Sequence, residues 1–399
     1  MTDTRESIQA EFEHWSTYHS TPAESDALIE RARKVCPVPH TQQLGGFHVF
    51  INYEDVRKGL LDWRTYSSGP SALRPYVEGM PAFPPNSFDP PVHTPWRKVF
   101  SDGINTRTAE RIEPFVHADT IRLIEAFQGR GTCDLKADFA EHIPMNAIFF
   151  ILGLDQELHD KVRSMTLQTL SVADKPEEFS KLFNAFAEFG YEQVERRRRE
   201  PADDYLTVLA DARMDDRPLT PEEIGGAVIS LLTAGHGTTL AALTNLMYEV
   251  LRRPDLKKRL QDDPSLIPAA VDEGLRLRHP FYGLYRTSTK DHELHGHKIK
   301  AGDSVLMCWH AGDRDPAMFE NPHDFNIDRP QYQTLAFGFG KHSCVGAATA
   351  RMEMRLALSE LLTRLPHIEL ERKEPETWTF AGAETQEIES LPARFTPVR

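Results

Sequence analysis

Residues 337–346 read FGFGKHSCVG, and this stretch decides how the rest of the chain is interpreted. Glycine has no Cβ atom, so a glycine-rich loop lets the backbone pass close to a large, flat partner. An apolar helical stretch begins directly after Cys344 and Gly346. A cysteine just before a helix N-terminus has its thiolate stabilised by free backbone N–H groups and by the positive end of the helix dipole. The stretch therefore predicts a loop that presents the Cys344 thiolate to a metal ion.

Two other uses of Cys344 stay open at this point. Most cysteines outside disulfides are small buried hydrophobes. A nucleophilic cysteine needs a base within hydrogen-bond reach, and His342 has no evident third group to orient it. The remaining cysteines, Cys36, Cys133 and Cys308, are scattered without paired spacing. We therefore expect neither a disulfide framework nor a zinc site, and a reducing cytoplasm is the expected location.

Composition excludes several classes of protein. The net charge of −14 argues against a nucleic-acid partner, because binding to phosphates needs a basic surface. The longest apolar run, residues 147–152, is far shorter than the roughly 18 residues of a membrane span. The first fifteen residues are polar and acidic, unlike a targeting segment. We expect a soluble protein that does not associate with a membrane.

The pattern along the chain is mainly helical. Residues 107–346 show 3.6-residue periodicity over most of their length. Thr220-Pro221-Glu222-Glu223 predicts a helix start, and the helix that follows stays nearly all apolar to about Leu251, which is typical of a central helix. Strands are expected in a small sheet at residues 45–51, 285–287, 297–299 and 304–308. We predict one mainly α domain with a small β region over residues 1–399.

Two further segments have simple interpretations. Residues 81–95 are rich in proline and cannot form regular structure, so we expect an ordered loop over a pocket. The basic run at residues 196–199 ends a charged helical stretch before Pro201. We interpret it as a solvated helix end.

The spacing Phe-x-x-Gly-x-x-x-Cys-x-Gly resembles the haem-ligand loop of cytochrome P450 enzymes. The resemblance extends over nearly the whole chain. The chain is similar to soluble bacterial members of the family, such as the camphor and monoterpene hydroxylases. It implies the P450 fold, with a long central helix over a buried haem b, and Cys344 as the iron ligand. Phe337, Gly338 and Gly346 match positions of the same loop that lie against the haem.

A charged pair on one helix face strengthens the resemblance. Glu273 and Arg276 lie three residues apart, so they can pair on a helix. They resemble the family's Glu-x-x-Arg element, and residues 321–329 (NPHDFNIDR) resemble the loop that supplies a second arginine, here Arg329. The resemblance implies a structural triad that holds the cysteine loop in place.

Four cationic or imidazole side chains match the family's partners of the haem propionates. Guanidinium groups pair with carboxylates in bidentate geometry, which suits this task. His93 and Arg97 lie in DPPVHTPWR (residues 89–97), which resembles a family segment. Arg286 and His342 match the other two partners by position.

The long helix contains LTAGHGTT at residues 232–239. Glycines and a hydroxyl inside a helix can open its hydrogen-bond ladder, or can allow close packing of a neighbour. The stretch resembles the family's dioxygen groove, with Ala234 against the haem and Thr238 as the groove threonine. The acid that the family places before this threonine is absent, because the position holds Gly237. Protons would then come through water beside Gly237, through His236, or from the substrate.

An apolar pocket is expected from position alone. Its candidate lining residues are Met80, Phe83, Leu231, Gly235, Phe281, Tyr282, Leu284 and Thr385. Most are apolar, which fits a small or medium-sized hydrophobic substrate.

The expected activity follows from these matches. The resemblance implies a haem-thiolate monooxygenase that inserts one atom of dioxygen into a terpenoid or aromatic molecule, by hydroxylation or O-dealkylation. Its electrons would come from a separate ferredoxin or flavodoxin with an NAD(P)H-dependent reductase, since we expect no fused reductase. A haem-thiolate enzyme that uses peroxide is the alternative, because Gly237 replaces the acid. A third hypothesis is a haem sensor without catalytic turnover.

Overall fold

The structure is a computed structural model that describes residues 3–17, 19–73, 82–171, 175–330, 332–372, 374, 378–381 and 385–398. The chain divides into two compact units, which are described separately below. Unit 1 consists of Met1–Tyr76, Ala241–Cys344 and Glu369–Leu391. Unit 2 consists of Val77–Leu240, Val345–Ile368 and Pro392–Arg399.

Unit 1 contains a five-stranded sheet in the order β1-β2-β10-β7-β3. Strand β10 runs parallel to β2 and antiparallel to β7. The strands of unit 1, including those outside this sheet, are β1 (His40–Thr41), β2 (Phe47–Phe50), β3 (Tyr66–Ser67), β7 (Leu284–Ser288), β8 (His292–Leu294), β9 (His297–Ile299), β10 (Ser304–Met307), β11 (Glu369–Leu370), β12 (Trp378–Ala381) and β13 (Thr385–Ile388). Its helices are α1 (Arg5–Phe12), α2 (Pro22–Val35), α3 (Tyr53–Leu61), α11 (Pro254–Asp262), α12 (Ile267–Leu277) and α13 (Trp309–Gly312).

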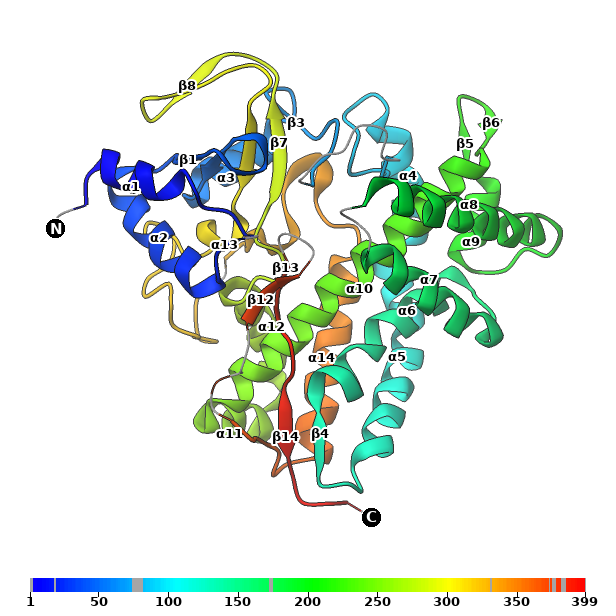
Figure 1. The fold of residues 1–399 in the computed structure, drawn as a ribbon. Coiled ribbons are helices and arrows are strands. Elements are labelled where there is room, and N and C mark those ends of the chain that lie inside the picture. The colour runs from blue at the N-terminus through cyan, green and yellow to red at the C-terminus, as the bar shows by residue number, and fades with distance from the viewer. Residues whose placement is uncertain are drawn as a thin grey trace. The chain divides into compact units, whose positions relative to one another are not determined.

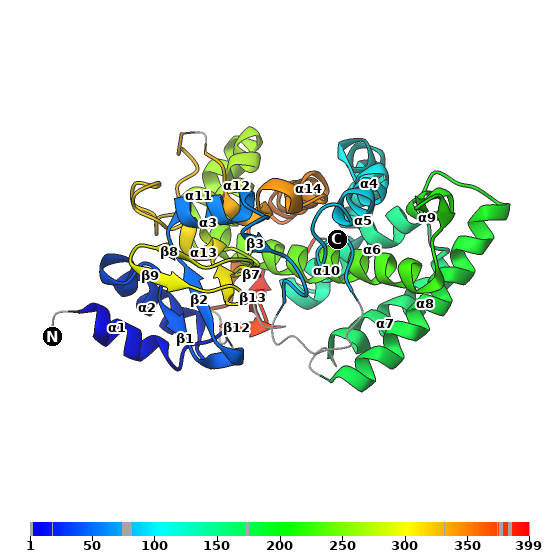
Figure 2. The same ribbon diagram turned by 90° about the horizontal axis from the view of Figure 1, so that it is seen from above.

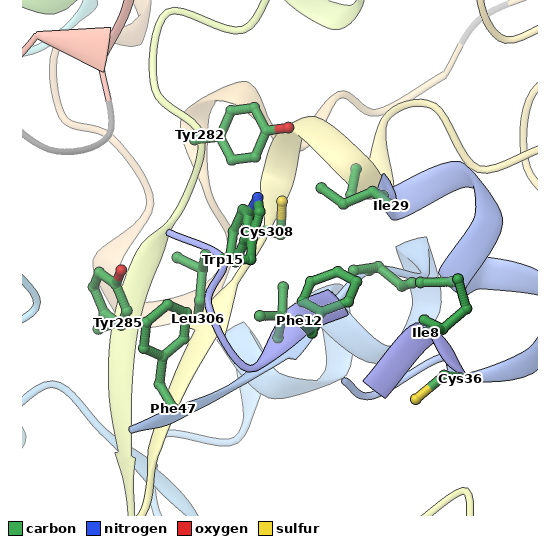
Figure 3. Packing of buried hydrophobic residues seen from close by; sticks show 14 residues of the cluster. Ile8, Phe12, Trp15, Ile29, Cys36, Phe47, Tyr282, Tyr285, Leu306 and Cys308 are labelled. Atoms are coloured by element: carbon green, nitrogen blue, oxygen red, sulfur yellow. The ribbon is translucent and has the colours of Figure 1, made fainter. Parts of the chain in front are cut away.

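The two central strands of this sheet are buried along their whole length. Every residue of β2 and of β10 is buried, which is typical of strands covered on both faces. On one side, Phe47 and Leu306 pack into a cluster with Phe12 and Trp15 of the N-terminal segment (Figure 3). The N-terminal helices therefore complete the hydrophobic core of unit 1.

Unit 2 is mainly helical. Its helices are α4 (His93–Gly103), α5 (Thr106–Phe127), α6 (His142–Leu152), α7 (His159–Ser171), α8 (Pro176–Arg199), α9 (Tyr205–Asp211) and α14 (Ala347–Arg364). Its strands are β4 (Thr132–Asp134), β5 (Arg213–Met214), β6 (Arg217–Pro218) and β14 (Pro392–Arg394). Helices α5 and α14 lie side by side (Figure 1), and so do α7 and α8 (Figure 2). Strand β14 pairs antiparallel with β4 and ties the C-terminal segment to this unit.

Helix α10 (Pro221–Leu251) is the long apolar helix that the sequence predicts. It begins with the expected capping box, because the Glu223 N–H donates to Thr220 Oγ1 (3.3 Å) and the Thr220 N–H donates to Glu223 Oε2 (2.8 Å). Its residues up to Leu240 belong to unit 2 and the remainder to unit 1. Among the described residues it alone is long and apolar enough to cross a membrane, but 72% of its most apolar window is buried, as in a core helix.

Small residues let α10 approach its neighbours closely. A Cβ atom on Gly225 would lie 2.7 Å from Ala187 Cα of α8. A Cβ atom on Gly235 would lie 2.9 Å from Ile148 Cδ1 of α6. Real Cβ atoms do not approach other atoms so closely, so these two glycines fix the distance between the helices.

The basic run at the end of α8 differs from the sequence-based interpretation. Arg197 is buried, and its Nε donates to Asp204 Oδ2 (2.6 Å) while its Nη2 donates to Gly153 O (2.7 Å). The interpretation of a solvated helix end is therefore wrong for Arg197. Its guanidinium joins the end of α6 to the start of α9, a long-range contact that local charge patterning cannot reveal.

Candidate functional site

The cysteine loop is shaped by two glycines. Gly338 and Gly340 have φ angles of +62° and +71°, a region that favours glycine. A Cβ atom on Gly340 would also lie 2.9 Å from Leu60 O of unit 1. The loop is closed by the Cys344 N–H, which donates to Phe337 O at 2.7 Å. The Cys344 side chain is exposed, unlike those of the other three cysteines.

The predicted triad is brought together within unit 1. Arg276 Nε and Nη2 donate to the two carboxylate oxygens of Glu273 at 2.8 and 2.9 Å, a bidentate pair. Arg329 Nε donates to Glu273 Oε1 at 2.9 Å. All three side chains are largely buried, so each charge depends on its partners.

Further donors complete the environment of Glu273. The Tyr332 hydroxyl donates to Oε2 (2.9 Å) and the Asn326 N–H to Oε1 (2.9 Å). Burial by itself would raise the pKa of Glu273, but hydrogen bonds from Arg276 and Arg329 bring that pKa below its ordinary value. Glu273 is therefore ionised at neutral pH. Sequence reasoning missed Tyr332, since it lies 59 residues away and belongs to no local motif.

Two of the four predicted carboxylate partners lie in unit 1. Arg286 is only 3% exposed on β7, and its Nη1 donates to Tyr285 O (2.8 Å). His342 ends a 3₁₀ turn in the cysteine loop, and its Nε2 is 3.0 Å from Ser68 Oγ. Ser68 thereby fixes the orientation of the imidazole.

The other two predicted carboxylate partners, His93 and Arg97, lie on one helix of unit 2. His93 is the first residue of α4 and is buried, while Arg97 follows four residues later and is partly exposed. Residues four apart share a helix face, so the two side chains emerge on the same side of α4.

The stretch 233–238 of α10 is unusual for a core helix. Ala234 is exposed although most of the helix is buried. Apart from the neighbouring residues of α10 itself, no atom of the described residues lies within 4 Å of the position that a Cβ on Gly237 would occupy. The Thr238 hydroxyl donates to Ala234 O at 2.7 Å, one turn back. Its proton is therefore engaged, and its lone pairs remain able to accept a hydrogen bond.

His236 does not share this face. Two residues on a helix are separated by about 200°, so the His236 side chain leaves α10 opposite Thr238. The imidazole is only 2% exposed, and burial lowers its pKa, with Glu141 acting in the other direction. The structure does not support the expected proton route through His236, because this is a buried, neutral side chain on the other face of the helix.

The pocket candidates of unit 1 fall into two groups. Phe281 forms a β-bridge with Thr385, and both side chains are partly exposed, as is that of Leu284. Tyr282 instead lies fully buried in the core cluster with Ile29 and Cys308, and Figure 3 shows it there. Its hydroxyl donates to Asp26 Oδ1 (2.9 Å), so the expectation that Tyr282 lines a pocket is wrong.

The pocket candidates of unit 2 lie mainly on α10. Leu231 is in the same helix stripe as Ala234 and Thr238, at i, i+3 and i+7. Gly235 faces Ile148 of α6, where it serves close packing. Phe83 is partly buried, with its ring 5.9 Å from that of Phe179. Met80 lies outside the described residues.

These features fit an iron carried by a large cofactor. Within the described ranges, no group of three or more His, Cys, Asp or Glu side chains could hold a metal ion. An iron bound by Cys344 would therefore take its remaining ligands from a cofactor. The exposed Cys344 side chain of unit 1 provides surface for such a group.

Comparison with known proteins identifies related chains. The sequence model of the family described as "Cytochrome P450" matches residues 164–383, more than half of the chain. The chain is 34% identical over 361 residues to the putative cytochrome P450 YjiB of Bacillus subtilis, covering 88% of this chain and 89% of that protein. It is 34% identical over 331 residues to the mycinamicin IV hydroxylase/epoxidase of Micromonospora griseorubida, covering 80% and 82%. Among solved structures, CYP108D1 from Novosphingobium aromaticivorans has a TM-score of 0.85 at 26% identity and covers 100% of both chains.

Proposed function

This chain belongs to the cytochrome P450 family, and we propose that it inserts one atom of dioxygen into a small or medium-sized hydrophobic molecule, either terpenoid or aromatic. The reaction is hydroxylation, or O-dealkylation where the substrate is an aryl ether. The chain is a haem b monooxygenase, as its relatives are. The observation that carries the proposal is the exposed Cys344 in a glycine-shaped loop, within a chain of this family.

Bound haem supplies the activation of dioxygen, and a thiolate ligand favours this chemistry. Cys344 is the proposed iron ligand. The triad of Glu273, Arg276 and Arg329 is the proposed support of the cysteine loop, with Tyr332 as an added donor. His93, Arg97, Arg286 and His342 are the proposed partners of the haem carboxylates, since guanidinium and imidazole N–H groups donate to carboxylate oxygens.

Proton handling is assigned to Thr238 and to the space beside Gly237. The Thr238 hydroxyl donates its proton in a hydrogen bond to Ala234 O, so Oγ1 acts as an acceptor toward the exposed side of the helix. The open space at Gly237 has room for water, which takes the place of a carboxylic acid as the proton donor. Water beside Gly237, oriented by a hydrogen bond to Thr238 Oγ1, therefore delivers the proton.

The proposed substrate contacts of unit 2 are Leu231, which is buried, and Ala234, which is exposed, both on α10. Those of unit 1 are Phe281 and Leu284, which are partly exposed and lie around the start of β7. Thr385 is the one hydroxyl among the candidates. We further propose a cytoplasmic location and a separate ferredoxin or flavodoxin with an NAD(P)H-dependent reductase as the electron source.

One experiment separates this function from peroxide chemistry. Purified holoenzyme is given aromatic ethers, monoterpenes and benzoates, with NADH, a surrogate ferredoxin and its reductase, or with hydrogen peroxide alone. We expect a low- to high-spin shift of the haem with at least one substrate and product only in the NADH arm. Product in the peroxide arm at an equal or greater rate would favour the second candidate, a peroxide-using enzyme, for which Gly237 is the supporting observation.

A variant tests the role of Thr238. Thr238→Ala removes the acceptor, so more of the NADH consumed should end as hydrogen peroxide and less as product. The measurement is the ratio of product to NADH. An unchanged ratio would show that Thr238 takes no part in proton handling.

A further inference from the structure

A buried carboxylate lies at the start of the cysteine loop, outside the triad. Asp313 follows α13 and is fully buried. Its oxygens accept hydrogen bonds from the Leu335 N–H, at 3.0 and 2.9 Å, and from the Thr334 hydroxyl. Residue 335 begins the 3₁₀ turn that opens the loop, so this one carboxylate fixes the point from which the loop starts.

A histidine supplies the remaining donor to this carboxylate. His279, fully buried just after α12, places its Nε2 2.7 Å from Asp313 Oδ2. The backbone oxygen of Asp313 accepts from Arg276 Nη1 at 2.8 Å. Asp313 therefore connects the triad, through Arg276, to the first turn of the loop.

The hydrogen bonds continue from this point to the cysteine. Thr334 Oγ1 accepts from the Ala336 N–H (3.0 Å) and so caps the turn Leu335–Phe337. Phe337 O, at the end of that turn, accepts the Cys344 N–H (2.7 Å). Each bond in the series is short and lies within unit 1.

We propose that Asp313 and His279 form a positioning pair that sets the orientation of the Cys344 thiolate toward iron. The proposal rests on the proposed role of Cys344 as the iron ligand. The pair holds the loop by its first turn, whereas the triad acts on the segment that precedes it. Both side chains act through residues 334–337.

The chain offers a matched control for this pair. Asp26 and His310 form a second His–Asp pair (2.8 Å) in unit 1, and His310 is as buried as His279. Asp26 accepts its hydrogen bonds from His310, Arg314 and Tyr282, which are not residues of the cysteine loop. Loss of the histidine leaves each carboxylate with its other donors, which are Thr334 and Leu335 for Asp313, and Tyr282 and Arg314 for Asp26.

The test compares His279→Ala and His310→Ala in the reduced, CO-bound holoenzyme. The readouts are the fraction of haem with the red-shifted thiolate band, its rate of loss in moderate urea, and the midpoint of urea unfolding by circular dichroism. We expect similar urea midpoints for the two variants. The rate at which the band is lost should be at least about tenfold higher in His279→Ala than in His310→Ala, since one lost buried hydrogen bond corresponds to about that factor. His279→Gln keeps a donor and should restore much of the band.

Asp313→Asn provides a second test that preserves shape. Its amide oxygen can still accept from the Leu335 N–H, so it should fold and show a smaller loss of the band than Asp313→Ala. The double variant of Asp313→Ala with His279→Ala should lose little more of the band than Asp313→Ala alone, because His279 acts through Asp313. Equal behaviour of the two His–Asp pairs, with a normal band in the unmodified enzyme, would overturn this inference alone. Absence of the band from the unmodified enzyme would overturn the proposed function as well.

Discussion

Glu353 on α14 is a buried carboxyl group whose protonation controls stability. The residue is 3% exposed, and its Oε2 has no hydrogen-bond partner among the described residues. Thr349, one helical turn earlier, is also buried and its Oγ1 lacks a partner in the same part of the chain. Burial raises the pKa of Glu353 from 4.5 to about 8, so the folded protein keeps this carboxyl neutral at pH 7.

The magnitude follows from the two pKa values. The pKa of Glu353 is higher in the folded protein than in the unfolded chain, so the folded protein binds more protons. The free energy of unfolding therefore falls as the pH rises from 4.5 to about 8. At about 1.4 kcal/mol per pH unit, the cost of holding the proton is about 1 kcal/mol at pH 5, about 3 at pH 7 and about 4 at pH 8. Glu353→Gln has the shape of the neutral acid and never ionises, so it avoids this cost.

The assay is urea unfolding of the holoenzyme at pH 5, 7 and 8. We expect Glu353→Gln to be more stable than the unmodified enzyme by an amount that grows by about 3 kcal/mol from pH 5 to pH 8. Glu360→Gln on the same helix is the control. Burial would raise the pKa of Glu360, but hydrogen bonds from His117 and Arg364 lower it, so that variant should lose stability at pH 8. Parallel pH profiles for Glu353→Gln and the unmodified enzyme would show that the Glu353 carboxyl does not keep its proton in the folded protein at neutral pH.

Three further substitutions test the architecture. Arg329→Ala leaves the buried Glu273 carboxylate short of one charged donor, and should lower the free energy of unfolding by about 3–5 kcal/mol in urea; a loss below 1 kcal/mol would contradict the triad. Gly225→Val forces apart α10 and the backbone at Ala187, and should cost about 1–3 kcal/mol by the same assay, with no cost if the helices were loosely packed. Tyr282→Phe should lower stability by about 1 kcal/mol and leave the Kd of a spin-shifting substrate unchanged, whereas weaker binding would return Tyr282 to the pocket.

The features that depend on local spacing could be predicted from the sequence. The fold class, mainly α with a small β region in the P450 fold, is confirmed by the related structures. The start of α10 follows from a capping box within four residues. The grouping of Glu273 with Arg276 follows from their i, i+3 spacing, and the glycines of the cysteine loop from their pattern.

The features that depend on tertiary contacts could not be predicted. Tyr282 lies in an irregular segment before β7, where no periodicity tells which way a side chain points. His236 is adjacent to the groove in sequence but on the other side of the helix. Asp313 and Tyr332 reach their partners across 22 to 59 residues, and no short motif records such contacts.

We propose that Cys344 holds the haem iron through its thiolate. The most direct measurement is the absorption spectrum of the reduced, CO-bound protein for the unmodified chain, for Cys344→Ser and for Cys133→Ser. We predict the red-shifted thiolate band in the unmodified chain and in Cys133→Ser, and its loss in Cys344→Ser. Retention of that band in Cys344→Ser would contradict the account.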